Sequence, residues 1–193
     1  MADIYLKRED IVAGLTRLGE LAHEDDRSIE IAVYGGSALI LAYDIRRATA
    51  DVDAVARHDA AYVRHLAAIV ARERRWPEDW LNDGVKGFIS RAEELLPLAF
   101  PHEAPGIRMY VPSPGYLLAM KCMAMRLGEE GSADEQDIKA LMRITGCTTA
   151  EGLKNLVEGY YAGKIIPARV AFGIEQVAQD YSDEHDSQPN HAP

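Results

Sequence analysis

The chain has 193 residues, of which 48% are apolar and 27% are charged. This size and composition are typical of one globular domain, or of a compact domain with a small helical appendage, that buries a substantial core. The formal net charge is −10, from 31 acidic and 21 basic residues. A general-purpose nucleic-acid binder normally has the opposite balance, so any nucleic-acid contact must use a local basic patch.

Secretion, membrane insertion and disulfide bonding are not expected from the sequence. The first residues, MADIYLKRED, contain no apolar segment of the kind found in a signal peptide. The longest apolar run, YLLAMKCMAM, is too short to span a bilayer and contains Lys121. Cys122 and Cys147 match no metal-ligand spacing and fit a reducing compartment. We therefore expect a cytoplasmic protein with no membrane partner.

The first half of the chain alternates between predicted helices and strands. Apolar residues at helical spacing predict helices, and the alternating or apolar runs SIEIAVY, ADVDAV and IRMYV predict strands. The turn residues of WPEDWLNDGVKGFIS predict a loop. In chain order, the expected elements are helix 8–24, strand 28–34, helix 37–45, strand 50–55, helix 58–75 and strand 107–111.

The second half of the chain is predicted to be helical. Ser113 and Pro114 begin a helix that ends near residue 127, and capping boxes at 132–135 and 148–151 begin two more. Pro167 begins a last helix that ends near residue 181. The expected fold class is α/β (α+β), a small mixed β-sheet flanked by helices. Its expected parts are a core (1–112), a helical segment closing a cleft (113–182) and a disordered tail (183–193).

Two carboxylates stand two residues apart in the predicted strand 50–55. Residues i and i+2 of a strand point to the same face, with Cα atoms about 6.6 Å apart, so Asp51 and Asp53 are expected to project together. Two such carboxylates repel each other unless a metal binds them or one of them is protonated. Oxygen ligands of this kind suit Mg²⁺ or Mn²⁺, which also bind phosphate.

A glycine turn precedes these acids. Gly35 and Gly36 stand where a predicted strand turns into a helix, so the backbone is able to approach a ligand closely. The first backbone N–H groups of that helix and the hydroxyl of Ser37 predict an anion site. Arg47 and Thr49 add a cation and a hydroxyl on the approach to the acids. Together these groups predict phosphoryl or nucleotidyl transfer.

The run GGSALILAYDIRRATADVD resembles the first motif of the polymerase-β-type nucleotidyltransferase superfamily. It is most similar to the bacterial branch that contains abortive-infection toxins of the AbiEii kind and related families of unknown function. WLNDGVKGF, IRMYVPSPGYLLAMKCMAMR and DEQDIKALM resemble later motifs of that branch in the same order. The resemblance implies that the aspartates bind Mg²⁺ and a nucleoside triphosphate. It also implies transfer of a nucleotide to a tRNA, protein or small-molecule acceptor, and a toxin role with a cognate antitoxin as partner.

A lysine and two aspartates fall on apolar helix faces in the second half. Lys121 is the only charge in YLLAMKCMAM, and Asp134 and Asp137 share a face with Ile138 and Leu141. One interpretation is an ion pair between Lys121 and Asp137 that joins two helices. The other, which the resemblance favours, is that Lys121 contacts nucleotide phosphate and an aspartate orients it.

The sequence departs from the superfamily in one respect. Many of its members take a third metal-binding carboxylate from a neighbouring strand, which we expect to be 107–111 and which contains no acid. Asp83, Asp134 or Asp137 then supplies the third charge, or the site has two carboxylates. Trp80, Asn82 and Asp83 are weaker candidates for a base pocket, with a core position favoured for Trp80. The predicted function is a metal-dependent nucleotidyltransferase; the alternative is a catalytically silent domain that binds or regulates a partner protein.

Overall fold

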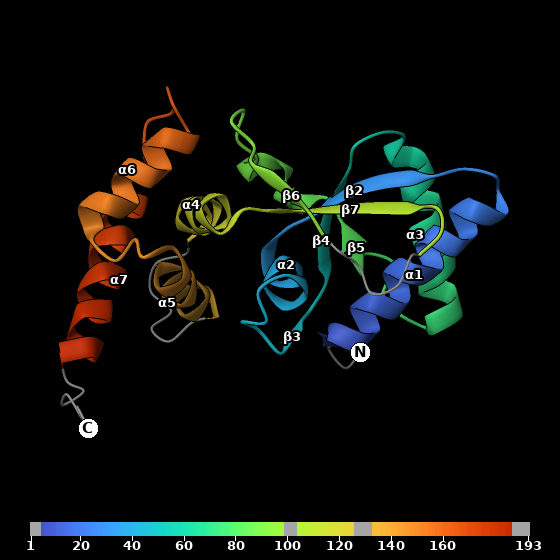
Figure 1. The fold of residues 1–193 in the computed structure, drawn as a ribbon, viewed down its shortest axis with the longest axis horizontal. Helices are drawn as coiled ribbons and strands as arrows, with labels where there is room; N and C mark the ends of the chain where they lie inside the picture. The colour runs from blue at the N-terminus through green and yellow to red at the C-terminus, as the bar shows by residue number, and fades with distance from the viewer. Residues whose placement is uncertain (1–4, 99–103, 126–132, 187–193) are drawn as a thin grey trace. The chain divides into compact units, whose positions relative to one another are not determined.

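The computed structural model describes residues 5–98, 104–125 and 133–186. These residues form a mixed α/β fold, as the sequence predicts (Figure 1). The chain divides into two compact units. The first comprises Met1–Gly87 and Glu94–Ser113, and the second comprises Phe88–Glu93 and Pro114–Pro193.

A five-stranded mixed sheet forms the centre of the first unit. Its strands are β2 (Ile29–Val33), β4 (Val52–Ala56), β5 (Leu81–Asn82), β6 (Leu95–Pro97) and β7 (Ile107–Pro112). Their order across the sheet is β5-β4-β2-β7-β6. β2 runs antiparallel to β4 and parallel to β7, β4 runs parallel to β5, and β6 runs antiparallel to β7. A separate pair joins β1 (Leu6–Lys7) to β3 (Ala48–Thr49).

This order contradicts one expectation from the sequence. Segment 107–111 was expected beside the acidic strand, but β7 pairs with β2 instead. The neighbours of β4 are β2 and β5. A carboxylate or amide that completes the acidic site from a neighbouring strand must therefore come from β2 or β5.

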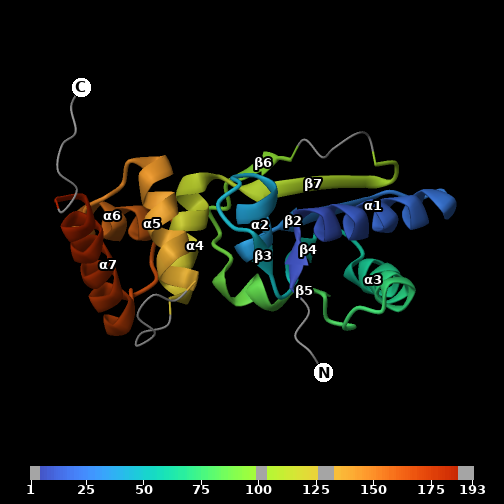
Figure 2. The same ribbon diagram turned by 90° about the horizontal axis from the view of Figure 1, so that it is seen from below.

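Among the described residues, three α-helices belong to the first unit: α1 (Arg8–Glu24), α2 (Gly35–Leu41) and α3 (Ala60–Arg74). α1 contacts α3 and packs against β7, while α3 packs against β4 (Figure 2). The apolar positions of α1 recur every three or four residues, and Ile11, Leu15 and Leu18 are fully buried. Asp59 caps α3 by accepting a hydrogen bond from the N–H of Tyr62.

Both tryptophans of the chain lie in the first unit, after α3. Trp80 is fully buried and donates its indole N–H to the carbonyl of Ala67, 3.0 Å away. Trp76 lies beside it, with ring centroids 5.1 Å apart. The preference for Trp80 as a core residue is confirmed.

The second unit consists mainly of helices. They are α4 (Pro114–Ala124), α5 (Ala133–Thr145), α6 (Ala150–Tyr160) and α7 (Ala168–Asp186). α6 begins one residue later than its predicted capping box, because Thr149 accepts the capping hydrogen bond from the N–H of Gly152. Ser132, the predicted cap of α5, lies outside the described residues.

The last helix is longer than the sequence predicts. α7 continues to Asp186, so the expected tail does not begin at residue 183. Tyr181 and His185 stack with ring centroids 4.1 Å apart on this last part of the helix. Residues 187–193, the remainder of the expected tail, lie outside the described residues. Among the described residues, the structure contains no helix of the length and apolarity needed to cross a membrane.

Candidate functional site

The first glycine of the predicted turn lies against the second aspartate. The N–H of Tyr34, at the end of β2, donates to the carbonyl of Asp53, 2.8 Å away. Gly35 follows with a φ of +57°, a conformation that L side chains rarely adopt. A Cβ atom at Gly35 would overlap Oδ2 of Asp53. Glycine is therefore required here both by the backbone conformation and by the approach of the carboxylate.

The second glycine lies against a threonine and an arginine. A Cβ atom at Gly36 would lie 2.7 Å from Oγ1 of Thr49 and 3.0 Å from Nη1 of Arg46. Thr49 is buried, in β3. Arg47, the arginine chosen from the sequence, is exposed, whereas Arg46 is half-buried. The irregular backbone between α2 and β3 decides which of the two adjacent arginines faces the turn, and no periodicity in the sequence reveals this choice.

Ser37 connects the glycine turn to the acidic segment. Its side chain is buried, and its hydroxyl donates to the carbonyl oxygen of Asp51, 2.9 Å away. This hydrogen bond fixes the backbone just before β4, where Asp51 lies. Binding of an anion by Ser37 stays a prediction.

Asp51 and Asp53 are both half-buried, the first just before β4 and the second within it. Asn82 of β5 is directly opposite Asp53 in the parallel pairing of the two strands. The side-chain amide of Asn82 donates to Oδ2 of Asp51 at 2.7 Å. The structure thus brings a third polar side chain to the acid pair, and that side chain is a neutral amide.

Asp83 follows Asn82 but pairs with cations. Its carboxylate accepts a hydrogen bond from Lys86 and lies 4.0 Å from Arg64. The hydrogen bond from Lys86 is the main reason that the pKa of Asp83 is below its usual range. Within the ranges that the structure describes, no three or more His, Cys, Asp and Glu side chains are grouped so that they could hold a metal ion. The protein's own contribution to a metal at Asp51 and Asp53 would therefore be two carboxylates.

The chemistry of the Asp51 and Asp53 carboxylates suits this share of a Mg²⁺ or Mn²⁺ site. Mg²⁺ is commonly held by one or two carboxylates, with substrate phosphates and water as its other ligands. The absence of a side chain at Gly35 lets the Asp53 carboxylate lie directly against the backbone of the turn. No fully buried side-chain oxygen or nitrogen lacks a hydrogen-bond partner in the described part of the chain. Hard oxygen ligands half-exposed at a glycine turn match the chemistry of a metal bound together with phosphate.

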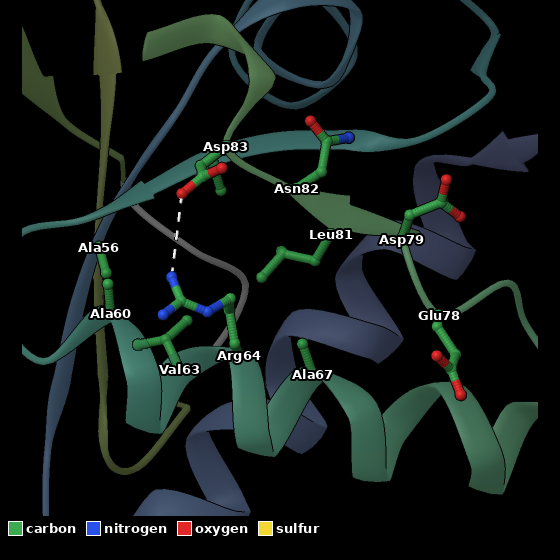
Figure 3. A pocket seen from close by; sticks show the side chains of 11 residues that line it. Ala56, Ala60, Val63, Arg64, Ala67, Glu78, Asp79, Leu81, Asn82 and Asp83 are labelled. Atoms are coloured by element: carbon green, nitrogen blue, oxygen red, sulfur yellow. Dashed lines mark ion pairs between the residues drawn. The ribbon is translucent and has the colours of Figure 1, made fainter.

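A pocket of about 320 Å³ lies on the other face of β4. Ala54 and Ala56 line it, and because strand side chains alternate, these two point away from the face of Asp53. Figure 3 shows the guanidinium of Arg64, on α3, turned toward the carboxylate of Asp83. The remaining lining residues are Ala60, Val63, Ala67, Glu78, Asp79, Leu81 and Asn82. Asn82 lines this pocket and also contacts Asp51, so the pocket borders the acidic segment.

Lys121, Asp134 and Asp137 form a cluster in the second unit. The ammonium of Lys121, on α4, lies 2.8 Å from Oδ1 of Asp134 and 2.8 Å from Oδ2 of Asp137, both on α5. The side chains of Lys121 and Asp137 are 11% and 5% exposed, whereas that of Asp134 is 38% exposed. The ion pair considered from the sequence is therefore present, with a second carboxylate added. Contact of Lys121 with phosphate stays a prediction.

Comparisons with known proteins give a family for the chain. No curated protein matches it. A solved structure of an antigenic nucleotidyltransferase-like protein from Paracoccidioides brasiliensis is similar, with 13% sequence identity and a TM-score of 0.48. That match covers 81% of this chain and 89% of the other. A family model described as "nucleotidyltransferase of unknown function (DUF6036)" matches residues 13–165. The family model supports the resemblance to nucleotidyltransferases, while the narrower likeness to the AbiEii kind stays a prediction. The chain belongs to this nucleotidyltransferase family of unknown function.

Proposed function

We propose that the chain is a metal-dependent nucleotidyltransferase whose metal site is formed by Asp51 and Asp53. The observation that carries the proposal is the fit between Gly35 and the Asp53 carboxylate, which leaves no room for a side chain at the turn. A backbone without side chains beside the Asp53 carboxylate suits a metal-bound triphosphate, because phosphate oxygens are able to approach both the backbone and the metal. Membership of a nucleotidyltransferase family supports this assignment.

In the proposed reaction, an acceptor hydroxyl attacks the α-phosphorus of a nucleoside triphosphate. A new phosphorus–oxygen bond forms, the bond to the bridging oxygen of the pyrophosphate breaks, and pyrophosphate leaves with the bonding electrons. The hydroxyl proton passes to solvent. A bound Mg²⁺ or Mn²⁺ supplies charge neutralisation of the phosphates and activation of the hydroxyl.

The chain's own residues position the reactants in this proposal. Asp51 and Asp53 hold the metal, and the Gly35–Gly36 backbone lies against the triphosphate. Arg46 and Thr49, which lie beside Gly36, add a positive charge and a hydroxyl near the phosphates. Such positioning, together with electrostatic stabilisation, supplies most of the catalysis in phosphoryl-group transfer.

The test is calorimetric titration with each of the four nucleoside triphosphates, with and without Mg²⁺, of the wild type and of Asp53→Asn. We expect metal-dependent binding of at least one triphosphate by the wild type. Asp53→Asn should weaken it by at least about tenfold, because it removes one of the two charged ligands. Asp79→Asn is the matched control, because Asp79 is an exposed acid that lines the pocket on the other face of β4. Binding that survives in Asp53→Asn would contradict the proposed metal site.

The acceptor and the biological role form a narrower part of the proposal. The resemblance to abortive-infection proteins leads us to propose a toxin that modifies a tRNA, a protein or a small molecule and is held inactive by a cognate antitoxin. Induced expression should then stop growth of a bacterial host, and expression of Asp53→Asn should not. Labelled triphosphate in the arrested cells would identify the modified fraction. Equal arrest by both proteins would exclude nucleotidyl transfer as its cause.

A second candidate function is that of a silent partner protein with the same fold. The absence of a group of three metal-ligating side chains among the described residues favours it. The calorimetric test bears on this choice, because a failure to bind any metal–triphosphate complex would favour the silent domain. In that case, affinity capture with the full chain would be used to find the protein that it binds.

A further inference from the structure

The residue next to the acid pair on the neighbouring strand is Asn82. Its backbone pairs with Asp53 across β4 and β5, and its side chain reaches Asp51. One side chain therefore contacts one acid while lying in register with the other. Because β5 consists of only Leu81 and Asn82, Asn82 is also the last residue of that strand.

Both polar atoms of the Asn82 side-chain amide form hydrogen bonds. Its Oδ1 accepts a hydrogen bond from the N–H of Gly84 at 2.9 Å, and its Nδ2 donates to Oδ2 of Asp51 at 2.7 Å. A backbone N–H is only a donor, so the amide oxygen must face Gly84 and the amide nitrogen must face Asp51. The two bonds agree on one orientation of the amide, and a flipped side chain would lose both of them.

This orientation has a consequence for metal binding. The Asn82 amide presents N–H to Asp51 and has its oxygen engaged by Gly84, so it is not placed as a metal ligand. It also occupies one of the two oxygens of Asp51 and adds no negative charge. A site with two carboxylates, one of them partly engaged, attracts a free divalent cation less than a site with three carboxylates does.

We propose that Asn82 is a positioning residue that orients Asp51 and keeps the site selective for a metal–triphosphate complex over the free metal ion. The selectivity for a metal–triphosphate complex rests on the proposed function. The orientation of Asp51 by Asn82 does not, because it concerns only these two side chains. Outer partners of metal ligands typically change metal affinity about 10- to 100-fold when they are replaced.

Two substitutions separate orientation from charge. Asn82→Asp keeps an oxygen acceptor for the N–H of Gly84 but places a carboxylate against Asp51 in place of the donor. We expect it to bind free Mn²⁺ at least about tenfold more tightly than the wild type, measured by the loss of the free-ion signal in electron paramagnetic resonance. Asn82→Ala removes the donor without adding charge. It should weaken binding of the Mn²⁺–triphosphate complex about tenfold or more without increasing the affinity for free Mn²⁺.

Thermal unfolding gives a second readout of the Asn82→Asp protein. Opposed carboxylates repel each other, so this variant should melt below the wild type without metal and regain stability on addition of Mn²⁺. The double variant Asp51→Asn/Asn82→Asp should not be stabilised by Mn²⁺. Asp79→Asn should melt as the wild type does, with and without the metal. Unchanged affinity for free Mn²⁺ in Asn82→Asp, or undiminished binding of the complex by Asn82→Ala, would overturn the inference.

An NMR measurement on the metal-free protein tests the geometry if Asn82→Asp does not fold. The side-chain amide signal of Asn82, assigned by its loss in Asn82→Ala, should shift in Asp51→Asn and not in Asp79→Asn. An unmoved signal in Asp51→Asn would overturn the inference. The proposed function fails separately, if the wild type binds no metal–triphosphate complex while Asn82→Asp still gains a site for free Mn²⁺.

Discussion

Gly35 combines two constraints, which among the described glycines Gly106 also combines, against backbone atoms of Gly19 and His23. Its φ of +57° disfavours any side chain, and a Cβ atom would overlap the Asp53 carboxylate. Gly146 and Gly163 also have positive φ values, but a Cβ atom would meet nothing within 4 Å at either position. Gly87 has open space and no positive φ. These glycines allow the contribution of the carboxylate contact to be measured.

Gly35→Ala should lower the free energy of unfolding of the first unit by about 1–3 kcal/mol, through backbone strain and displacement of Asp53. Chemical denaturation followed by tryptophan fluorescence measures the change. Gly87→Ala, in the same unit, should change stability by no more than about 0.5 kcal/mol. Equal stabilities of the two variants would contradict both the backbone strain at Gly35 and the constraint from its contact with Asp53.

Among the elements, the α4–α5 pair depends on how deeply its ion pairs are buried. Lys121 lies 2.8 Å from an oxygen of each aspartate, so distance does not distinguish the two pairs. Burial does, because the Asp137 side chain is 5% exposed and that of Asp134 is 38% exposed. The energetic weight of the cluster should therefore fall mainly on Asp137.

Asp137→Asn should cost about 3–5 kcal/mol, because it leaves a buried ammonium with less compensation. Asp134→Asn should cost at most about 1 kcal/mol, since water screens the more exposed pair. Urea denaturation of the three proteins, followed by circular dichroism, gives the comparison. Similar costs for both variants would indicate that Lys121 is more accessible to water than its 11% exposure implies.

The longer elements are predictable from the sequence, and the shortest ones are not. The expected helix 8–24 coincides with α1, because burial of one face imposes a 3.6-residue period on a long segment. β5 spans only Leu81–Asn82, too short for any alternation to be visible. The pairing of β5 with β4 is a tertiary contact that leaves no local pattern in the sequence. The sequence therefore does not predict which strands lie beside the acidic strand.

Within the candidate site, contacts between residues near in sequence are predictable, and contacts between distant residues are not. The closeness of Gly35 to Asp53 follows from a strand, a turn and a returning strand that are near in sequence. The contact of Asn82 with Asp51 joins residues 31 positions apart. The sequence of residues 82–84, Asn-Asp-Gly, did indicate a turn, and the hydrogen bond from Gly84 to Asn82 is of the kind found in such turns. Nothing local indicated which acid the amide would reach.

At the scale of the whole molecule, both cysteines of the chain belong to the second unit. Cys122 is fully buried, and burial raises the pKa of its thiol to about 12. Burial also raises the pKa of Cys147, which is only half-buried. Because the thiolate is the reactive form, an aromatic disulfide reagent should modify Cys147 slowly and Cys122 only after unfolding.

Counting the released chromophore in native and denatured protein tests this expectation. The native protein should show one slow reaction, which Cys147→Ala should abolish, and the denatured protein should show two equivalent thiols. Rapid modification of both cysteines in the native protein would mean that the second unit opens readily.

Because both tryptophans lie after α3 and both cysteines lie in the second unit, the protein has a separate intrinsic signal for the unfolding of each unit. Indole emission reports only the first unit, because Trp76 and Trp80 both belong to it, whereas thiol accessibility reports only the second. A single denaturant series followed by both signals therefore reveals whether the two units melt as one cooperative block or in sequence. Because Trp80 immediately precedes β5, its emission should also respond to binding at Asp51, which Asn82 contacts, without any attached dye.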